Sequence, residues 1–326
     1  AQERASIELA DQQKLAIHAA LESNVAVITG GPGVGKTTVV NCLMKILHAK
    51  RFRVALAAPT GRAARRLAET TGREAMTIHR LLKFNPRERD FTFNADEPLK
   101  ADAVIIDEAS MIDVPLMSAL VLALPDGCKL VLVGDIDQLP SVGPGDLLRE
   151  VIRSGVANVV RLTEIFRQAQ SSLIVTNAHR INTGELPNIK PDEAEHSDPD
   201  FFFINKEDPD EVVETIKMLC TQRIPAKFGL HPLDDVQVIS PMHKGTVGTS
   251  NLNVELQASL NPDRGGPGAF ALQRSGRTYR NGDKVMQLLN NYDKEVFNGD
   301  VGRISRIDTE GQQIEVAFDE RRVRYD

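Results

Sequence analysis

A glycine-rich segment between a strand-like and a helix-like run constrains the fold of this chain most. Residues 30–38 read GGPGVGKTT, a β-branched run at 25–29 precedes them, and a helical pattern at 36–49 follows. This is the spacing G-x-x-x-x-G-K-S/T in the strand–loop–helix context that it needs. Glycines let backbone N–H groups curl around phosphate oxygens, and the helix N-terminus adds a positive partial charge. The segment therefore predicts a nucleotide-phosphate site rather than a glycine-rich turn that binds nothing.

The loop residues have separate expected roles in holding ATP and Mg²⁺. Lys36 can reach the β- and γ-phosphates, and the Thr37 hydroxyl can ligate Mg²⁺. The nucleotide-binding residues expected in the loop are Gly30, Gly31, Pro32, Gly33, Val34, Gly35, Lys36, Thr37 and Thr38.

A second strand-like run ends in two carboxylates. Residues 104–110 read VIIDEAS, so the apolar run 104–106 delivers Asp107 and Glu108 to its carboxyl end. Asp107 would hold Mg²⁺, and Glu108 would orient and deprotonate the attacking water. An Asp-Glu pair is also a common helix N-cap signal. Because the pair follows a phosphate-binding loop, NTP hydrolysis is the favoured reaction.

A third strand-like run, 130–133, continues into a loop that is both polar and stiff. Residues 132–145 read LVGDIDQLPSVGPG. A connector explains the glycines but not a glutamine, Gln138, held between a buried strand and a Pro-Ser-Val turn. If the strand lies beside the other two, the Gln138 amide could sense the γ-phosphate or the attacking water.

Strands and helices alternate through the first half of the chain. Strand-like runs at 25–29, 54–58, 104–106 and 130–133 are followed by helical patterns at 36–49, from 62, at 114–122 and at 147–152. Apolar strands between helices predict an α/β fold, with a parallel sheet covered on both faces. Ligands of such sheets bind at the carboxyl ends of the strands.

The rest of the chain predicts an insertion and two further parts. Polar and apolar residues alternate around RDFTFN, which predicts a small hairpin at 84–97 inserted in the first domain. A helix at 171–182 and strands at 201–204 and 236–240, flanking a helix at 211–220, suggest a second α/β domain. Short strands near 284–288, 302–307 and 313–318 suggest a small β-barrel-like module. The expected domains are 1–161, 162–260 and 261–326.

Charge is distributed unevenly along the chain. The net charge of −6 argues against binding nucleic acid over the whole surface. However, residues 60–89 hold eight Lys or Arg against three Glu, whereas residues 191–214 hold ten Asp or Glu against one Lys. A polyanion would be attracted to the first segment and repelled by the second. The alternative is that both are solvated faces.

Cysteine usage and hydropathy indicate a cytoplasmic protein. Cys42, Cys128 and Cys220 are widely separated and lack C-x-x-C spacing, which argues for a reducing compartment and against a disulfide framework or a zinc site. The longest apolar run, around 114–124, is too short to span a bilayer, and nothing at the N-terminus resembles a signal peptide. The chain opens on Ala1 rather than Met, which suggests a processed or excised piece.

Several ordered segments resemble the motifs of superfamily 1 DNA helicases, specifically the 5′-to-3′ RecD-like branch. Besides the two catalytic segments they are LADQQKLAI (9–17), APTGRAARRL (58–67), TIHRLL (77–82), GDIDQLPSVGPG (134–145), LTEIFRQ (162–168), SPMHKGTVGTSNLN (240–253) and GDKVMQLLNNYDKEVFNGDVGRI (282–304). The resemblance covers nearly the whole chain. It implies two RecA-like P-loop NTPase domains, the second one incomplete, with a β-hairpin insertion and an SH3-like β-barrel insertion.

The resemblance also implies roles for single residues near the nucleotide. Gln13 would contact the adenine, and Gln138 would couple the γ-phosphate to DNA. Arg167 would touch the γ-phosphate from the second domain, so that hydrolysis breaks a bridge and lets the cleft open. A surface salt bridge with Glu164 is the alternative for Arg167. The catalytic residues expected are Lys36, Asp107, Glu108, Gln138 and Arg167.

A further set of residues would contact DNA. They are Thr60, Gly61, Arg62, His79, Pro140, Ser141, Val142, Pro241, Lys244 and Gly245. A helix N-terminus with solvated arginines is the alternative for residues 60–62, and a structural role is the alternative for His79. The hairpin resembles the short pin of this branch that is proposed to split the duplex. Its aromatic residues, Phe84, Phe91 and Phe93, could equally pack the hairpin onto its own domain.

Two motifs of the family are missing from the sequence. Neither an HKSQG-like segment nor an Arg-bearing TRA-like segment occurs, and the chain stops at RRVRYD. The second arginine that stabilises transition-state charge would then be missing, and such arginines can be worth several orders of magnitude in rate. We therefore expect a C-terminally truncated helicase that binds Mg-ATP and single-stranded DNA but hydrolyses ATP slowly.

Three functions remain open at this stage. The leading one is an ATP-dependent 5′-to-3′ DNA helicase or translocase of DNA repair or recombination, acting as a monomer on single-stranded DNA and single-strand–duplex junctions. A nucleotide-dependent DNA-binding or regulatory subunit without unwinding activity fits the missing motifs but not the intact pair Asp107–Glu108. A P-loop NTPase acting on another substrate does not explain the basic segment 60–89 or the order of the DNA-type motifs.

Overall fold

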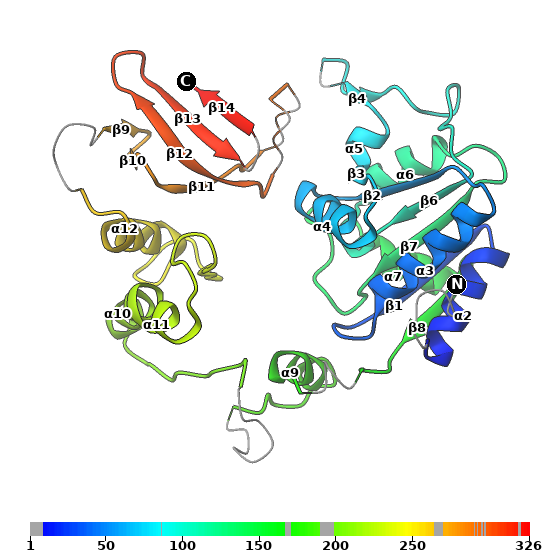
Figure 1. Ribbon diagram of the computed structural model, residues 1–326, viewed down its shortest axis with the longest axis horizontal. Coiled ribbons are helices and arrows are strands. Elements are labelled where there is room, and N and C mark those ends of the chain that lie inside the picture. Colours follow the sequence, from blue (N-terminus) through cyan, green and yellow to red (C-terminus); the bar gives the residue numbers. More distant parts are fainter. Residues whose placement is uncertain are drawn as a thin grey trace. The chain divides into compact units, whose positions relative to one another are not determined.

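The computed structural model describes residues 9–85, 87–166, 171–189, 199–263, 270–289, 291, 293–294, 296, 298–318 and 321–326. The chain forms two compact units, Ala1–Phe203 and Ile204–Asp326. Figure 1 shows helices around a sheet in the first unit, and helices and antiparallel strands in the second. The domain boundaries expected at 161 and 260 stay predictions.

The first unit contains a six-stranded sheet with the strand order β3-β2-β6-β7-β1-β8. All adjacent strands of this sheet are parallel. The strands are β1 (Val25–Gly30), β2 (Val54–Ala58), β3 (Met76–Thr77), β6 (Ala103–Ile106), β7 (Lys129–Gly134) and β8 (Asn158–Leu162). Every residue of β6 is buried, as expected for a strand with both faces covered.

Helices cover both faces of this sheet (Figure 1). They are α2 (Asp11–Glu22), α3 (Lys36–Ala49), α4 (Gly61–Thr71), α5 (Ile78–Leu81), the 3₁₀ turn η1 (Ala109–Met111), α6 (Val114–Leu122) and α7 (Leu147–Ser154). Helices α2, α3 and α4 pack on one core cluster, and α5, α6 and α7 on another. Successive strand residues alternate between the two clusters because strand side chains point to opposite faces: Ile28 belongs to the first and Val27 to the second. The α/β architecture expected from the sequence is confirmed.

Side-chain caps fix where two of these helices begin. The Thr60 hydroxyl accepts a hydrogen bond of 3.2 Å from the Ala63 N–H, and the Asp113 carboxylate accepts one of 2.9 Å from the Leu116 N–H. Each cap satisfies an N–H group that has no partner within the helix. Glycine in the left-handed conformation ends α4 at Gly72 and α7 at Gly155.

The hairpin expected near residue 84 is confirmed as a short antiparallel pair. Strand β4 (Phe84–Asn85) pairs with β5 (Asp90–Phe91), and Phe84 lies opposite Phe91. The two rings lie 5.1 Å apart, and each lies 5.7 Å from the His79 ring of α5. Aromatic packing thus holds the hairpin against its own unit.

The first unit also includes helix α9 (Leu173–Asn182). The Ser172 hydroxyl caps it by accepting a hydrogen bond of 3.2 Å from the Val175 N–H. The helix lies within the range 171–182 that the sequence predicted to be helical.

The second unit combines helices with small antiparallel sheets. The helices are α10 (Pro209–Met218), the π-turn η2 (Leu219–Arg223), α11 (Ile224–Phe228) and α12 (Thr249–Leu260). Strands β9 (Ala271–Arg274) and β10 (Arg277–Arg280) form a pair, and β11 (Lys284–Met286), β12 (Val301–Asp308), β13 (Gln313–Phe318) and β14 (Arg321–Tyr325) form a four-stranded sheet. A separate cluster of buried residues, including Ile304 and Val316, lies beneath these strands. The small β module expected at the end of the chain is confirmed.

Two predicted strands were wrong. Residues 201–204 and 236–240 form no strand, and neither segment pairs with another strand of the described chain. Phe203 is 57% exposed and Ile239 is 88% exposed. An apolar run becomes a strand only when a neighbouring strand pairs with its backbone N–H and C=O groups. Hydropathy alone therefore predicted strands that these two segments do not form.

Two further properties concern the chain as a whole. Across the described ranges, no helix combines the length and the apolar character that crossing a bilayer requires. Cys42, Cys128 and Cys220 are all buried and all in the free form.

Candidate functional site

The glycine-rich loop joins β1 to α3 at the carboxyl edge of the parallel sheet. Gly33 and Gly35 both have a φ of 76°, a left-handed conformation that glycine adopts without strain. A Cβ at Gly35 would also collide with the Gln13 amide. The N–H groups of Gly31, Gly33, Val34 and Gly35 donate no hydrogen bond to any acceptor in the described parts of the chain. Unpaired N–H groups at a helix N-terminus form a cradle that suits phosphate oxygens.

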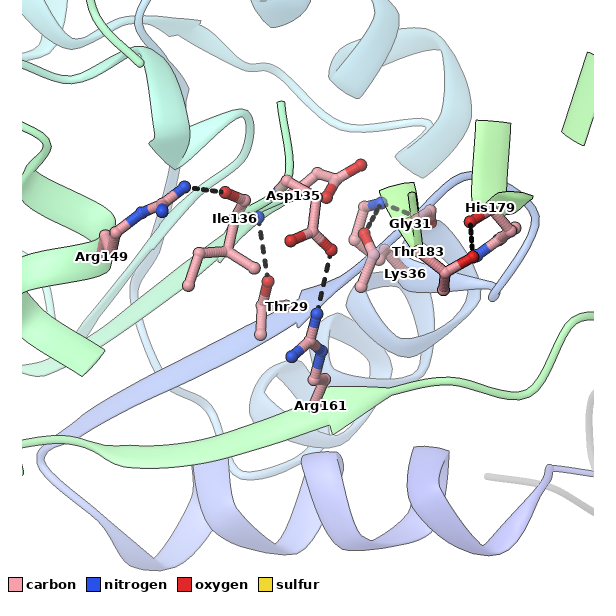
Figure 2. A network of polar contacts seen from close by, with 11 residues as sticks. Thr29, Gly31, Lys36, Asp135, Ile136, Arg149, Arg161, His179 and Thr183 are labelled. Atoms are coloured by element: carbon pink, nitrogen blue, oxygen red, sulfur yellow. Dashed lines mark hydrogen bonds and ion pairs between the residues drawn. The ribbon is translucent and has the colours of Figure 1, made fainter. Parts of the chain in front are cut away.

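Lys36 is held across this loop. Its ammonium donates to the Gly30 carbonyl at 2.6 Å and to the Gly31 carbonyl at 2.9 Å (Figure 2). An ammonium has three N–H donors, so one remains for a phosphate oxygen. Burial lowers the pKa of Lys36, and the carboxylates of Asp135, Glu108 and Asp107 oppose that shift. The site is therefore a partly buried cation with three carboxylates around it.

Asp107 and Glu108 follow β6 directly, as the sequence predicted. The Asp107 carboxylate accepts a hydrogen bond of 2.9 Å from the Glu108 N–H, and Glu108 has a φ of 53°. This left-handed conformation is uncommon for a residue with a side chain, and it turns the chain sharply after the strand. Burial raises the pKa of Asp107 and of Glu108, and Lys36 and Arg66 oppose the shift in both cases. Perturbed carboxyl groups beside a phosphate loop are typical of catalytic sites.

Asp135 is a site residue that sequence reasoning missed. It follows β7 directly, is 4% exposed, and is the carboxylate with the largest effect on Lys36. Its carboxylate accepts a hydrogen bond of 3.0 Å from the Asp137 N–H. The available signal was its position: it is the first residue after a buried strand, as Asp107 is.

Hydrogen bonds anchor the loop around Asp135 to three elements (Figure 2). The Ile136 N–H donates to the Thr29 hydroxyl of β1 at 3.2 Å, and Arg149 of α7 donates to the Ile136 carbonyl at 3.1 Å. Arg161 of β8 donates to the Asp137 carboxylate at 3.0 Å. The loop therefore starts from a fixed position at the sheet edge.

The second half of the same loop is open to solvent. Gln138 is exposed, and its side chain makes no hydrogen bond to any residue that the structure describes. The Ser141 hydroxyl donates to the carbonyls of Gly143 and Gly145 at 3.0 and 2.9 Å, which folds the loop back on itself. Pro140 and Val142 are exposed at the tip. Roles in phosphate sensing and DNA contact stay predictions for Gln138, Pro140, Ser141 and Val142.

Gln13 lies against the phosphate loop. It is 2% exposed, accepts a hydrogen bond of 3.2 Å from the Ala10 N–H, and donates to the Gly35 carbonyl at 3.4 Å. Contact with an adenine stays a prediction for Gln13. The neighbouring Gln12, which the sequence did not single out, bonds to the Thr163 hydroxyl at 2.9 Å and N–H at 2.7 Å. Arg167 lies outside the described residues.

Mg²⁺ would be held by few protein ligands here. Within the described residues, no group of three or more His, Cys, Asp or Glu side chains could hold a metal ion. Mg²⁺ typically takes one or two carboxylates together with substrate phosphates, rather than a cage made only of protein groups. Thr37 at the start of α3 and Asp107 after β6 fit that donor set. Thr38 occupies the same first turn.

The predicted DNA contacts divide between the two units. Thr60 and Gly61 begin α4, where the oxygen of the Thr60 hydroxyl accepts the capping hydrogen bond, while Arg62 is exposed. His79 packs against Phe84 and Phe91, and burial lowers its pKa. These observations favour structural roles for Thr60 and His79, and the DNA contacts there stay predictions.

Pro241, Lys244 and Gly245 lie on an exposed loop of the second unit, directly before α12. The Ser240 hydroxyl closes this loop by donating to the Val247 carbonyl at 2.7 Å. Gly245 has a φ of 91°, which favours glycine there. Their contact with DNA also stays a prediction.

Comparison with known proteins agrees with this geometry. An AAA domain family matches residues 13–144, and the ATP-dependent RecD-like DNA helicase SH3 domain matches residues 252–318. The chain is 35% identical over 311 residues to the ATP-dependent RecD2 DNA helicase of Deinococcus radiodurans, covering 95% of this chain and 40% of that protein. It is 31% identical over 331 residues to the RecBCD enzyme subunit RecD of Mycobacterium tuberculosis, covering 90% of this chain and 55% of that protein.

A solved structure of two Pif1 helicases acting at forked duplex DNA shares the fold. The TM-score is 0.51 at 20% identity, covering 98% of this chain and 76% of that chain. The present chain thus spans between 40% and 55% of the curated relatives above. The sequence matches show that the chain is similar to RecD-like DNA helicases over most of its length, and the solved structure shares its fold.

Proposed function

We propose that this chain carries the nucleotide site and part of the DNA-binding surface of an ATP-dependent 5′-to-3′ DNA helicase. The observation that carries the proposal is the meeting of Lys36, Asp107, Glu108 and Asp135 at one edge of the parallel sheet. A cation surrounded by carboxylates, next to unpaired backbone N–H groups, suits a nucleoside triphosphate with its divalent cation.

Each side chain of the site would have a separate role toward ATP. The remaining N–H of Lys36 would bind a phosphate oxygen, while Thr37 and Asp107 would hold Mg²⁺. When bound, Mg²⁺ supplies positive charge to the phosphate oxygens. Glu108, with its raised pKa, would orient the attacking water and accept its proton. The negative charge of Asp135 would stabilise the positive charge of Lys36.

Coupling to DNA would pass through the loop that begins at Asp135. One end of this loop is anchored at the sheet edge, and the other end presents Pro140 and Val142 to solvent. A displacement at the phosphate end could therefore reach a DNA strand at the exposed end. Arg62, Lys244 and the basic segment 60–89 would attract the DNA backbone.

The names of the relatives suggest the biological setting. One named relative is a DNA helicase and the other is a subunit of the RecBCD enzyme. We therefore place the protein in DNA repair or recombination in the cytoplasm, acting on single-stranded DNA and single-strand–duplex junctions as a monomer.

Strand displacement tests the helicase proposal. A longer form of the protein that continues beyond Asp326 should unwind a duplex with a 5′ single-stranded tail and leave a 3′-tailed duplex intact. Lys36→Ala should abolish ATP hydrolysis and keep DNA binding in the absence of nucleotide. Unwinding from a 3′ tail would refute the polarity, and a lack of unwinding with intact DNA-stimulated hydrolysis would favour a DNA-binding or regulatory subunit.

Slow turnover by the 326-residue chain is a separate proposal. It is supported by the absence of an Arg-bearing TRA-like segment from these residues. DNA-stimulated ATP hydrolysis should be lower for this chain than for the longer form by at least about tenfold, since such arginines are worth several orders of magnitude. Equal and robust rates would contradict it.

A further inference from the structure

Two side chains, those of Lys36 and His179, form hydrogen bonds to carbonyl groups of the phosphate loop. Lys36 bonds to the carbonyls of Gly30 and Gly31, and the next carbonyl, that of Pro32, lies 3.2 Å from the Nε2 atom of His179. A carbonyl oxygen can only accept a hydrogen bond, so Nε2 carries the hydrogen in this contact. Three successive carbonyls of the loop are thus held, while the N–H groups of the loop remain available.

The imidazole of His179 also lies close to Gly31. A Cβ on Gly31 would lie 2.7 Å from the Cε1 atom of the imidazole, a separation that real Cβ atoms essentially never show. Gly31 has no left-handed φ that would require glycine. The imidazole itself is therefore the reason that position 31 suits glycine, and one side chain contacts two adjacent residues of the loop.

The helix that carries His179 is braced by its own hydrogen bonds. Asn177, which is 2% exposed, donates to the Asn188 carbonyl at 3.0 Å and accepts from the Asn188 N–H at 2.6 Å. The Thr183 hydroxyl donates to the His179 carbonyl at 3.3 Å. The imidazole is therefore presented by a fixed helix end rather than by a flexible loop.

We propose that His179 is a positioning residue of the nucleotide site, which holds the Pro32 carbonyl and links the phosphate loop to α9. The proposal rests on the proposed function, because it assigns a role within the same site. A loop that is already fixed loses less conformational freedom when phosphate binds, so affinity increases. The same contact makes α9 respond when the loop is filled, and the chain continues from α9 toward the second unit.

Two substitutions separate the hydrogen bond from the ring. His179→Gln retains an N–H donor of similar reach, whereas His179→Phe retains a ring of similar size without a donor. His18→Ala, an exposed histidine of α2, is the control. Equilibrium binding of a fluorescent ATP analogue with Mg²⁺ should weaken about fivefold for His179→Phe, the value of one neutral hydrogen bond, and less than about twofold for the other two variants. Thermal unfolding midpoints should be alike.

Unchanged binding by His179→Phe would overturn the proposal, and so would equal weakening by His179→Gln, because the hydrogen bond would then not matter. Hydrogen–deuterium exchange without nucleotide supplies an independent test. Amides of the helix at residues 173–182, which the contact links to the loop, should exchange faster in His179→Phe than in the wild-type chain and in His179→Gln.

The two proposals can fail separately. If the wild-type chain binds no nucleotide, the proposed function is wrong. The exchange comparison still decides the role of His179 in that case, since equal rates in all variants would show that it does not hold the loop.

Discussion

Glu108 combines a left-handed backbone with a half-buried carboxyl group at the end of β6. If it is the general base, Glu108→Gln should lower kcat for ATP hydrolysis about 10²- to 10⁴-fold, because the amide cannot accept the proton of the attacking water. The affinity for ATP should change little, since Lys36 and the loop N–H groups bind the phosphates. Steady-state hydrolysis and equilibrium nucleotide binding check both parts. A variant that retains most of kcat would remove Glu108 from the reaction.

The same residue predicts how hydrolysis depends on pH. A general base must be ionised, and burial raises the pKa of Glu108 above its ordinary value of 4.5. The rate should therefore fall on the acid side at a pH above 4.5, rather than at the pH where an exposed glutamate titrates. A pH profile of kcat/KM measures this limb. An acid limb at or below the ordinary value would contradict the buried environment of Glu108.

The two carboxyl groups also predict the effect of pH on stability. An acid with a raised pKa in the folded state binds protons more readily when folded, so the free energy of unfolding decreases as pH rises from the unfolded value through the folded pKa. Because the pKa of Asp107 and of Glu108 is raised, Asp107→Asn and Glu108→Gln should raise the unfolding midpoint at pH 7.

This gain should shrink toward the ordinary pKa values of 3.8 and 4.5, where the wild-type carboxyl groups become protonated too. Thermal unfolding at a series of pH values measures the difference. An exposed carboxylate offers the control: Asp11→Asn should show no comparable gain. Variants that are less stable than the wild-type chain at pH 7 would contradict the prediction.

At the scale of elements, local sequence predicted best those helices and strands whose ends are marked by a change of residue type. Helix α3 and strands β2 and β13 have the predicted bounds. In each of them, the regular pattern of apolar residues stops at a glycine, a proline or a charged residue. Helix α2 was missed, since its buried face is made mostly of alanines, such as Ala16 and Ala20, and gives a weak pattern. The strands predicted at 201–204 and 236–240 failed because their existence depends on a pairing partner that hydropathy does not reveal.

The hairpin of β4 and β5 provides a prediction at the element scale. Its two-residue strands are too short to be stable alone, so the cluster of His79, Phe84 and Phe91 should hold it in place. Phe91→Ala should increase amide exchange over residues 84–93 and leave nucleotide affinity unchanged, because the ring contacts of Phe91 lie within the hairpin and α5. Hydrogen–deuterium exchange with a parallel binding measurement tests this. Unchanged protection would show that the aromatic cluster does not hold the hairpin.

At the scale of the whole molecule, the site depends on strand order more than on any single motif. Lys36, Asp107 and Asp135 are far apart in sequence, and they meet because β6, β7 and β1 are neighbours in the sheet. The sequence predicted that strand ends share one edge, which was enough to select Lys36 and Asp107. It could not give the order of the strands, and that order brings Asp135 into the charged cluster around Lys36. The left-handed turn at Glu108 and the reach of His179 from α9 also depend on tertiary packing.

The division into two units leads to the last prediction. The described hydrogen bonds of the phosphate loop involve Gln13, Lys36, Phe166 and His179, all within the unit Ala1–Phe203. Residues 202–211 are exposed, and no helix or strand covers 202–207, so a protease should cut there, for example trypsin at Lys206. The N-terminal fragment should bind ATP with the affinity of the intact chain, whereas single-stranded DNA should bind more weakly, since Lys244 and its loop are lost. Limited proteolysis followed by both binding measurements tests these two expected affinities. The Lys206→Gln variant, which trypsin should not cut at this position, is the control. A fragment that has lost ATP affinity would mean that the second unit completes the nucleotide site.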